Sequence, residues 1–172
     1  EVLPPEVGLS VTAVTVTPDL IGIAVTPTAD SAACPGCGTS SSSVHSRYVR
    51  TVAELPWQGR RVVLRVTVRR FRCRHGGCER TIFCERLHQV LAPHAQMTNR
   101  LTTAHRVIGF ALGGEAGSRL TTHLAVPTSP DTLLRRVAKA PSPASRTPRV
   151  LGVDDFAFRR GESYGTILMD LE

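Results

Sequence analysis

Four of the five cysteines form two close pairs that together could hold a metal ion. Cys34 and Cys37 flank a Pro-Gly dipeptide, and Cys73 and Cys78 flank an Arg-His-Gly-Gly turn. A structural zinc ion takes four ligands in a tetrahedron, and two short turns with two thiolates each can supply them. Without an export signal, such spacing favours metal over disulfides. The pattern predicts structural Zn²⁺ on these four thiolates, with His75 as an alternative to Cys78.

An aspartate pair near the end of the chain could contribute to a second kind of metal site. Asp154 and Asp155 follow the apolar run Val150–Val153. Metal-dependent phosphoryl transfer needs two or three carboxylates that hold a pair of hard cations about 4 Å apart. Aspartate pairs are also common at solvent-facing strand ends, so the motif alone leaves both interpretations open.

Positive charge is concentrated in the middle of the chain. The formal net charge is +7, and residues 34–148 hold 18 basic and 5 acidic side chains. The first 33 residues have four acidic side chains and no Lys or Arg. A basic segment between acidic ends is typical of a protein that binds a polyanion. No apolar run reaches the roughly 20 residues of a membrane span, so we expect no membrane partner.

The segments before and between the two cysteine pairs are predicted to form strands. Residues 9–26 predict two strands around Pro18-Asp19, and residues 44–52 a further strand. Residues 61–73 give the clearest pattern, because apolar and basic side chains alternate. The apolar face holds Val62, Leu64, Val66 and Val68, and the basic face holds Arg61, Arg65 and Arg69. That basic face suits either a DNA phosphate backbone or plain solvent, and charge alone does not decide.

From residue 97 the apolar period becomes helical, and three helices are expected within residues 97–140. Their predicted inward faces include Leu101, Leu112, Leu120, Leu124, Leu133 and Leu134. Gly113-Gly114 ends the first, and Pro127 ends the second. Ser129-Pro130-Asp131 begins the third, with a capping hydroxyl and a proline in the first turn. We expect a helix-turn-helix whose third helix enters the major groove, with an ordinary three-helix bundle as the alternative. Its outward polar residues are Thr132, Arg135, Arg136 and Lys139.

The fold class expected is α+β and multi-module. N-terminal strands occupy residues 1–33, a small β-rich zinc ribbon residues 34–90, and the helix-turn-helix residues 97–140. A Pro/Ser linker follows at 141–149, and a β-hairpin at 150–172.

Taken in order, these segments resemble the ISL-three family of bacterial insertion-sequence transposases. The likeness lies in CPGCG, the RRFRC strand end, ALGGEAGSRL, TSPDTLLRRV and, most specifically, VLGVDDFAFRRGESYGTILMDLE. It implies that residues 150–172 open an RNase-H-like catalytic domain that uses an Asp-Asp-Glu triad and Mg²⁺. Asp154 matches the first catalytic carboxylate.

The resemblance also implies partners and a location. The zinc ribbon and the helix-turn-helix would bind double-stranded DNA, namely the terminal inverted repeats of the element. The protein would act in the cytoplasm, at the nucleoid. A homo-oligomer is compatible with this. Because the chain ends before the rest of the triad, we expect it to bind DNA without cutting it. The alternative hypothesis is a transcription regulator with a zinc ribbon and a helix-turn-helix. The third hypothesis is a protein-interaction module stabilised by zinc.

Overall fold

The computed structural model describes residues 7–141, 147–159 and 161–171. The chain divides into two compact units, Glu1–Lys139 and Ala140–Glu172. Residues 1–6 of the expected N-terminal segment, residues 142–146 of the expected linker, Arg160 and Glu172 lie outside the described residues.

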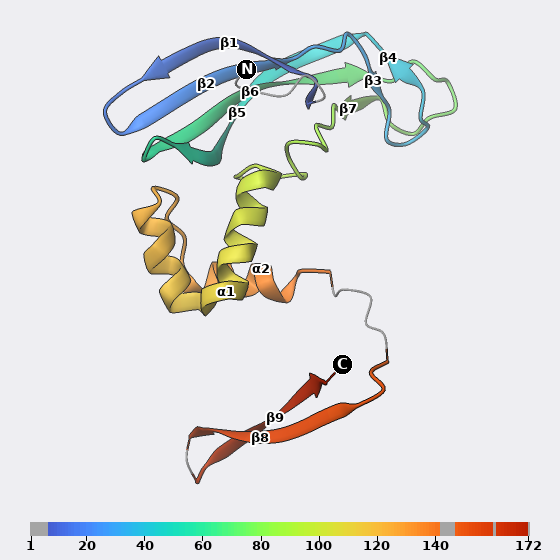
Figure 1. Ribbon diagram of the computed structural model, residues 1–172. Coiled ribbons are helices and arrows are strands. Elements are labelled where there is room, and N and C mark those ends of the chain that lie inside the picture. The colour runs from blue at the N-terminus through green and yellow to red at the C-terminus, as the bar shows by residue number, and fades with distance from the viewer. Residues whose placement is uncertain (1–6, 142–146, 160, 172) are drawn as a thin grey trace. The chain divides into compact units, whose positions relative to one another are not determined.

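One mixed sheet organises the first unit. Strands β1 (Leu9–Val16) and β2 (Leu20–Pro27) form a hairpin, and β2 pairs in parallel with β6 (Arg60–Arg72). On the other edge of β6 lies β5 (Val44–Trp57), antiparallel to it, and β7 (Ile82–Cys84) extends the β2 side. Figure 1 shows the order β1-β2-β6-β5. The predicted strands are therefore confirmed, and the N-terminal strands share the sheet of the long hairpin.

The first unit has two separate cores, on opposite faces of β6. The larger contains Val62, Leu64, Val66 and Val68, as predicted, and packs against β2 and the segment around Leu91. Side chains alternate along a strand, so Phe71 lies on the other face. It stacks on Phe83 and packs against Cys34 in the smaller core.

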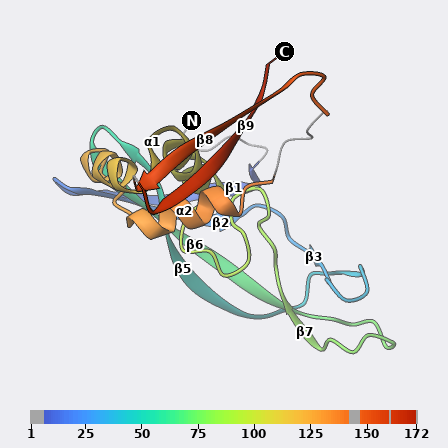
Figure 2. The same ribbon diagram turned by 90° about the horizontal axis from the view of Figure 1, so that it is seen from below.

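The cysteine pairs meet at one end of the β5–β6 hairpin. The short strands β3 (Ala32–Ala33) and β4 (Ser40–Ser41) pair with each other and bracket the first cysteine pair. Figure 2 shows β3 and β7 at the same end of this hairpin. The sheet therefore brings together two turns that are far apart in the sequence.

Helix α1 (Asn99–His123) is held to the sheet at its first residue. Thr98 caps the helix by accepting the N–H of Leu101, and its hydroxyl donates to the buried carboxylate of Glu54 at 3.0 Å. At Gly113 the backbone is non-helical, with φ 70° and ψ −162°, so α1 consists of two helical segments (Figure 1). Only glycine adopts this region readily.

Helix α2 (Pro130–Ala138) packs closely on both segments of α1. Ser129 caps it and accepts the N–H of Thr132, as the sequence predicted. Leu133 is fully buried between the helices, and a Cβ built on Gly117 would lie 2.8 Å from its Cδ1. The predicted apolar faces were wrong in part, because Leu112, Leu120, Leu124 and Leu134 are exposed. The buried side of α1 carries Leu101, as predicted, and otherwise small or polar residues, namely His105, Gly109, Gly117 and Thr121.

The second unit is a two-stranded hairpin. Strands β8 (Leu151–Arg159) and β9 (Ser163–Asp170) are antiparallel, close to the predicted bounds. Most of their side chains are exposed, including Phe158 and Leu168. No helix in the described part of the chain has the length and apolarity to cross a membrane.

Candidate metal centre and DNA-contact residues

The four cysteines are positioned by tight turns with their own backbone hydrogen bonds. In the first turn, Gly38 donates its N–H to the carbonyl of Cys34, and Cys34 donates to Thr39. In the second, the N–H of Cys78 donates to His75. Each turn therefore presents its two sulfur atoms on one side.

The sulfur atoms lie at the separations that a zinc ion requires. All four Sγ atoms are within 4.8 Å of one another. Cys34 Sγ lies 3.8 Å from Cys78 Sγ, and Cys37 Sγ lies 3.6 Å from Cys73 Sγ. A tetrahedron with Zn–S bonds of about 2.3 Å has edges of roughly 3.8 Å. The site therefore fits structural Zn²⁺ on four thiolates, and Cys78 rather than His75 completes the cluster of candidate ligands.

Protons compete with the metal for these sulfurs. Hydrogen bonds with Thr39 lower the pKa of Cys37 to about 6. The pKa of Cys73 is raised to about 12, since desolvation and the neighbouring thiols outweigh the lowering effect of the His75 backbone N–H. Four thiolates so close together need a cation to stabilise them, and zinc ionises the thiols that it binds.

Comparison with known proteins agrees with this centre. Residues 30–78 match the family model described as zinc-finger of transposase IS204/IS1001/IS1096/IS1165. The chain is also 31% identical over 153 residues to the transposase for insertion sequence element IS1001 of Bordetella parapertussis. Both matches support the resemblance of this chain to ISL-three family transposases. The alignment covers 87% of this chain but only 36% of that relative's length. No solved structure matches the chain.

The three arginines on the basic face of β6 differ in exposure: two are open to solvent and one forms a buried ion pair. Arg61 and Arg65 are exposed. Arg69 instead binds Glu85, with Nη2 2.7 Å from Oε2, and its side chain is 11% exposed. Its guanidinium also lies 5.1 Å from the ring centroid of Phe71. Arg69 thus joins β6 to the segment after β7, and its guanidinium is already occupied within the protein.

The polar residues of helix α2 also differ in their exposure to solvent. Arg135 and Lys139 are exposed, and Thr132 is half-buried with its hydroxyl 2.8 Å from that of Ser129. Arg136, which the sequence placed outward, is half-buried. Its guanidinium contacts His105 Nδ1 and lies 2.8 Å from Met97 Sδ. The exposed cations of α2 are therefore Arg135 and Lys139.

The contacts of His105 identify its protonation state. The side chain is 1% exposed, and Nε2 lies 3.0 Å from the carbonyl oxygen of Val126. Nε2 must donate to that carbonyl, so Nδ1 accepts from Arg136. Burial, followed by the positive charge of Arg136, lowers the pKa of His105. A neutral histidine therefore links α1, α2 and the segment between them.

Asp154 lies on β8, opposite Ile167 of β9. Its Oδ1 accepts the N–H of Asp155 at 2.9 Å, whereas Asp155 Oδ1 accepts the hydroxyl of Thr166 at 2.9 Å. Among the described residues, three or more potential metal ligands gather only at the four cysteines. Asp154 is thus an exposed strand carboxylate without further carboxylates gathered around it in that part of the chain.

Sequence reasoning missed three buried polar residues that organise these elements. Glu54 accepts a hydrogen bond from Thr98, the cap of α1, and Glu85 forms an ion pair with Arg69. His105 links the helices through its hydrogen bond to the carbonyl of Val126. The spacing of Leu101, His105 and Gly109 marks one helix face and could have identified the histidine. No sequence signal distinguishes Glu54 or Glu85 from surface glutamates.

Proposed function

We propose that this chain is the DNA-recognition region of a transposase, and that α1 and α2 act as a helix-turn-helix. The observation that carries the proposal is the attachment of α2. Leu133 is buried against α1, while Arg135 and Lys139 remain exposed. A short helix held on one side and cationic on the other suits the major groove. The transposase identity of the IS1001 relative supports this assignment.

The exposed arginines of the sheet would supply phosphate contacts. Arg61 and Arg65 project from the same face of β6, and Arg47 of β5 is exposed in the row that pairs with Arg69. Glu85, the acidic residue that binds Arg69 on this face, is buried. Phosphate contacts fix a protein's register on DNA without reading its sequence. We assign this role to Arg47, Arg61 and Arg65.

The element's terminal inverted repeats are the proposed target, bound by one or more copies of the chain. In the same proposal, residues 150–172 open an RNase-H-like domain and Asp154 is one of its catalytic carboxylates. Hard carboxylate oxygens suit Mg²⁺, which would supply Lewis-acid activation of a phosphodiester. Asp154 would hold that ion through its carboxylate. The regulator alternative has no comparable support, since the curated relative is a transposase.

DNA binding by fluorescence anisotropy tests the recognition role. Wild-type protein is titrated into a duplex that carries an element end and into a scrambled duplex of equal length. Arg135→Ala is expected to weaken binding to the element end by about 1–3 kcal/mol if Arg135 reads a base. Binding to the scrambled duplex should change far less. Arg119→Ala is the matched control, because Arg119 is also exposed but lies on α1.

Two results would contradict the proposal. Equal affinity of the wild type for both duplexes would remove sequence recognition altogether. Equal losses on both duplexes for Arg135→Ala would reduce Arg135 to a phosphate contact and remove α2 as the reading helix.

A further inference from the structure

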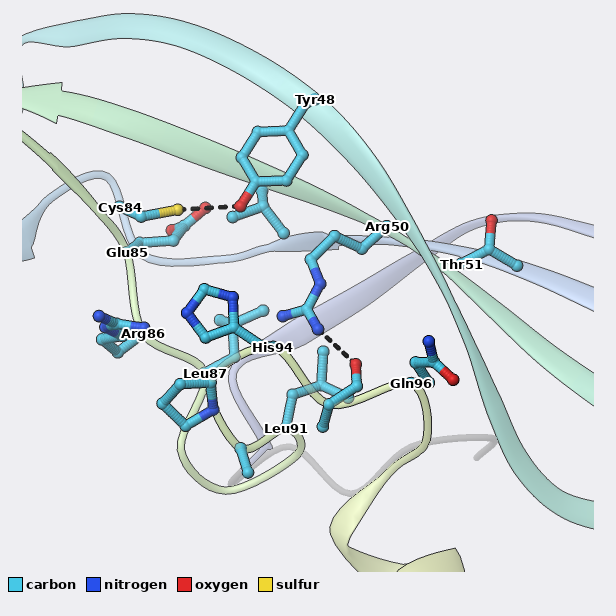
Figure 3. Close-up of a pocket in the computed structure, with 14 residues that line it drawn as sticks. Tyr48, Arg50, Thr51, Cys84, Glu85, Arg86, Leu87, Leu91, His94 and Gln96 are labelled. Carbon is cyan, nitrogen blue, oxygen red and sulfur yellow. Dashed lines mark hydrogen bonds between the residues drawn. The ribbon is translucent and has the colours of Figure 1, made fainter. Parts of the chain in front are cut away.

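A pocket of about 470 Å³ opens beside the edge strand β5, away from both α2 and the cysteine cluster. One wall is β5, with Tyr48 and Arg50, and the other is the segment 84–96, which carries Arg86 and His94. Figure 3 shows Arg50 and His94 pointing into the space between these two walls. This volume is within the range of about 300–1,000 Å³ that small-molecule sites occupy.

The pocket combines positive charge with an apolar surface. Arg50, Arg86 and His94 line it, and the one acidic lining residue, Glu85, is already bound by Arg69. Arg50 donates to the carbonyl oxygen of Ala95, but a guanidinium has five N–H donors, so others remain. The apolar lining includes Val68, Leu87 and Leu91. A free inorganic anion would not use this apolar surface, and an apolar ligand would not use the cations.

The aromatic side chain of the pocket is held in place. The hydroxyl of Tyr48 lies 3.1 Å from Cys84 Sγ, and the guanidinium of Arg70 lies 5.0 Å from the ring centroid. The hydrogen bond with Cys84, together with burial, raises the pKa of the Tyr48 phenol, so the ring is neutral. A fixed, neutral ring beside apolar side chains is a surface on which a planar base can pack.

His94 is held in an unusual backbone conformation at the pocket mouth. Its φ is 59°, in the left-handed region that non-glycine residues rarely adopt. Such strain persists only where the surrounding structure imposes it, and it is concentrated at functional sites. The following residue, Ala95, is tied to Arg50, so the same contact fixes the loop and orders the cationic wall.

We propose that this pocket binds an unpaired nucleotide of DNA. The base would pack against Tyr48, Val68 and Leu91, and the phosphate would lie against Arg86, Arg50 and His94. This inference rests on the proposed DNA-binding function but assigns a separate site with a separate substrate preference. It predicts that the chain prefers DNA with unpaired nucleotides over a fully paired duplex of the same sequence, once α2 recognition is removed.

The test compares two probes on the whole chain. A short fluorescein-labelled single strand of the scrambled sequence, which gives α2 no element end to read, and the blunt duplex made from it are titrated with wild-type protein, His94→Asn and Arg86→Ala. Asparagine tolerates left-handed backbone, so His94→Asn removes the imidazole while the loop is kept. His88→Asn is the matched control, since His88 is exposed in the same segment but does not line the pocket.

Each pocket variant is expected to weaken single-strand binding roughly tenfold and duplex binding less than about twofold. A photoreactive thymidine in the single strand should crosslink to the tryptic peptide 87–100 in the wild type and less in His94→Asn. Equal losses on both probes, or no loss on either, would overturn the proposal. Failure of the Arg135 experiment alone would leave it standing, because that experiment measures duplex recognition by α2.

Discussion

Arg65 and Arg69 lie on the same face of β6, but their surroundings differ. Arg65 is exposed, whereas Arg69 is bound to a glutamate that is itself 4% exposed in its side chain. Removing one partner of a buried ion pair leaves the other charge desolvated and unpaired, which is costly. The two arginines therefore contribute to different properties of the protein.

Arg69→Ala is expected to lower the free energy of unfolding by about 3–5 kcal/mol, because Glu85 would remain buried without its cation. Urea denaturation followed by circular dichroism measures this loss. Arg65→Ala is the matched control and should change stability by no more than about 0.5 kcal/mol. Instead it should reduce the salt dependence of DNA binding by about one phosphate contact. Equal stabilities for the two variants would show that the ion pair does not hold β6 to the segment after β7.

His105 should make the stability of the helical pair depend on pH. Its pKa is lowered in the folded protein from an ordinary value of 6.5, so the unfolded chain binds the proton more readily. The stabilisation is fully present above about pH 6.5 and is lost as the pH falls through the lowered folded-state pKa. Thermal melts across this range should show a falling Tm. In His105→Gln, which can still donate to Val126, this part of the pH dependence should disappear. An unchanged pH profile in that variant would contradict the assignment.

The contact between α1 and α2 depends on glycines of α1, which have no side chain to keep the helices apart. Gly109 and Gly117 are buried, and a Cβ at either position would approach a side chain of α2 within 3 Å. Apolar periodicity predicted leucine faces for these helices, yet several of those leucines are exposed. The packing of the two helices is determined by the close approach of glycine backbones to Leu133. A pattern of hydrophobic residues cannot predict such a contact, because glycine is not part of that pattern. The strands were more predictable, because alternation in β6 correctly identified its buried residues Val62, Leu64, Val66 and Val68. It did not identify the burial of Arg69.

Gly117→Ala is expected to destabilise the helical pair by about 1–3 kcal/mol, since the new methyl group would overlap Leu133 Cδ1. Hydrogen exchange of the amides in α2 should accelerate, while exchange in β6 stays the same. Gly76→Ala serves as the control, because a Cβ there meets nothing within 4 Å. Unaltered protection of α2 in Gly117→Ala would mean that the helices can separate without loss.

For the whole molecule, the metal and the sheet stabilise different regions. The larger core contains eleven buried residues and none of the four zinc-binding cysteines, whereas the smaller core is built on Cys34, Phe71 and Phe83. Three buried side chains alone are too few to hold a module together, so small modules commonly rely on a metal. The sequence predicted the four ligands from their spacing. It did not reveal that the N-terminal strands would share the ribbon's sheet, because the β2–β6 pairing joins distant segments.

Zinc removal is expected to unfold one end of the first unit and leave the rest. The protein should bind about one equivalent of zinc, and a chelator should expose the amides of residues 73–84 to hydrogen exchange. Amides of residues 62–68 should remain protected, because the larger core does not use the metal. Cys37→Ser should lose zinc, whereas Cys84→Ser should retain it as the control. Global unfolding on chelation would show that the two cores are not independent.

The parallel pairing of β2 with β6 has a consequence for synthesis of the chain on the ribosome. Leu20 and Arg61 are partners in that ladder, so β2 emerges well before the strand that covers its edge. Until then its Ile21, Ile23 and Val25 are exposed on a hairpin with an open edge, a form that invites association with other chains. Between β2 and β6 the chain makes the first cysteine pair and the strand β5, and the second cysteine pair follows only after β6. The nascent protein therefore depends on slow, non-local closure, and newly made copies should be most prone to aggregation before β6 has left the ribosome.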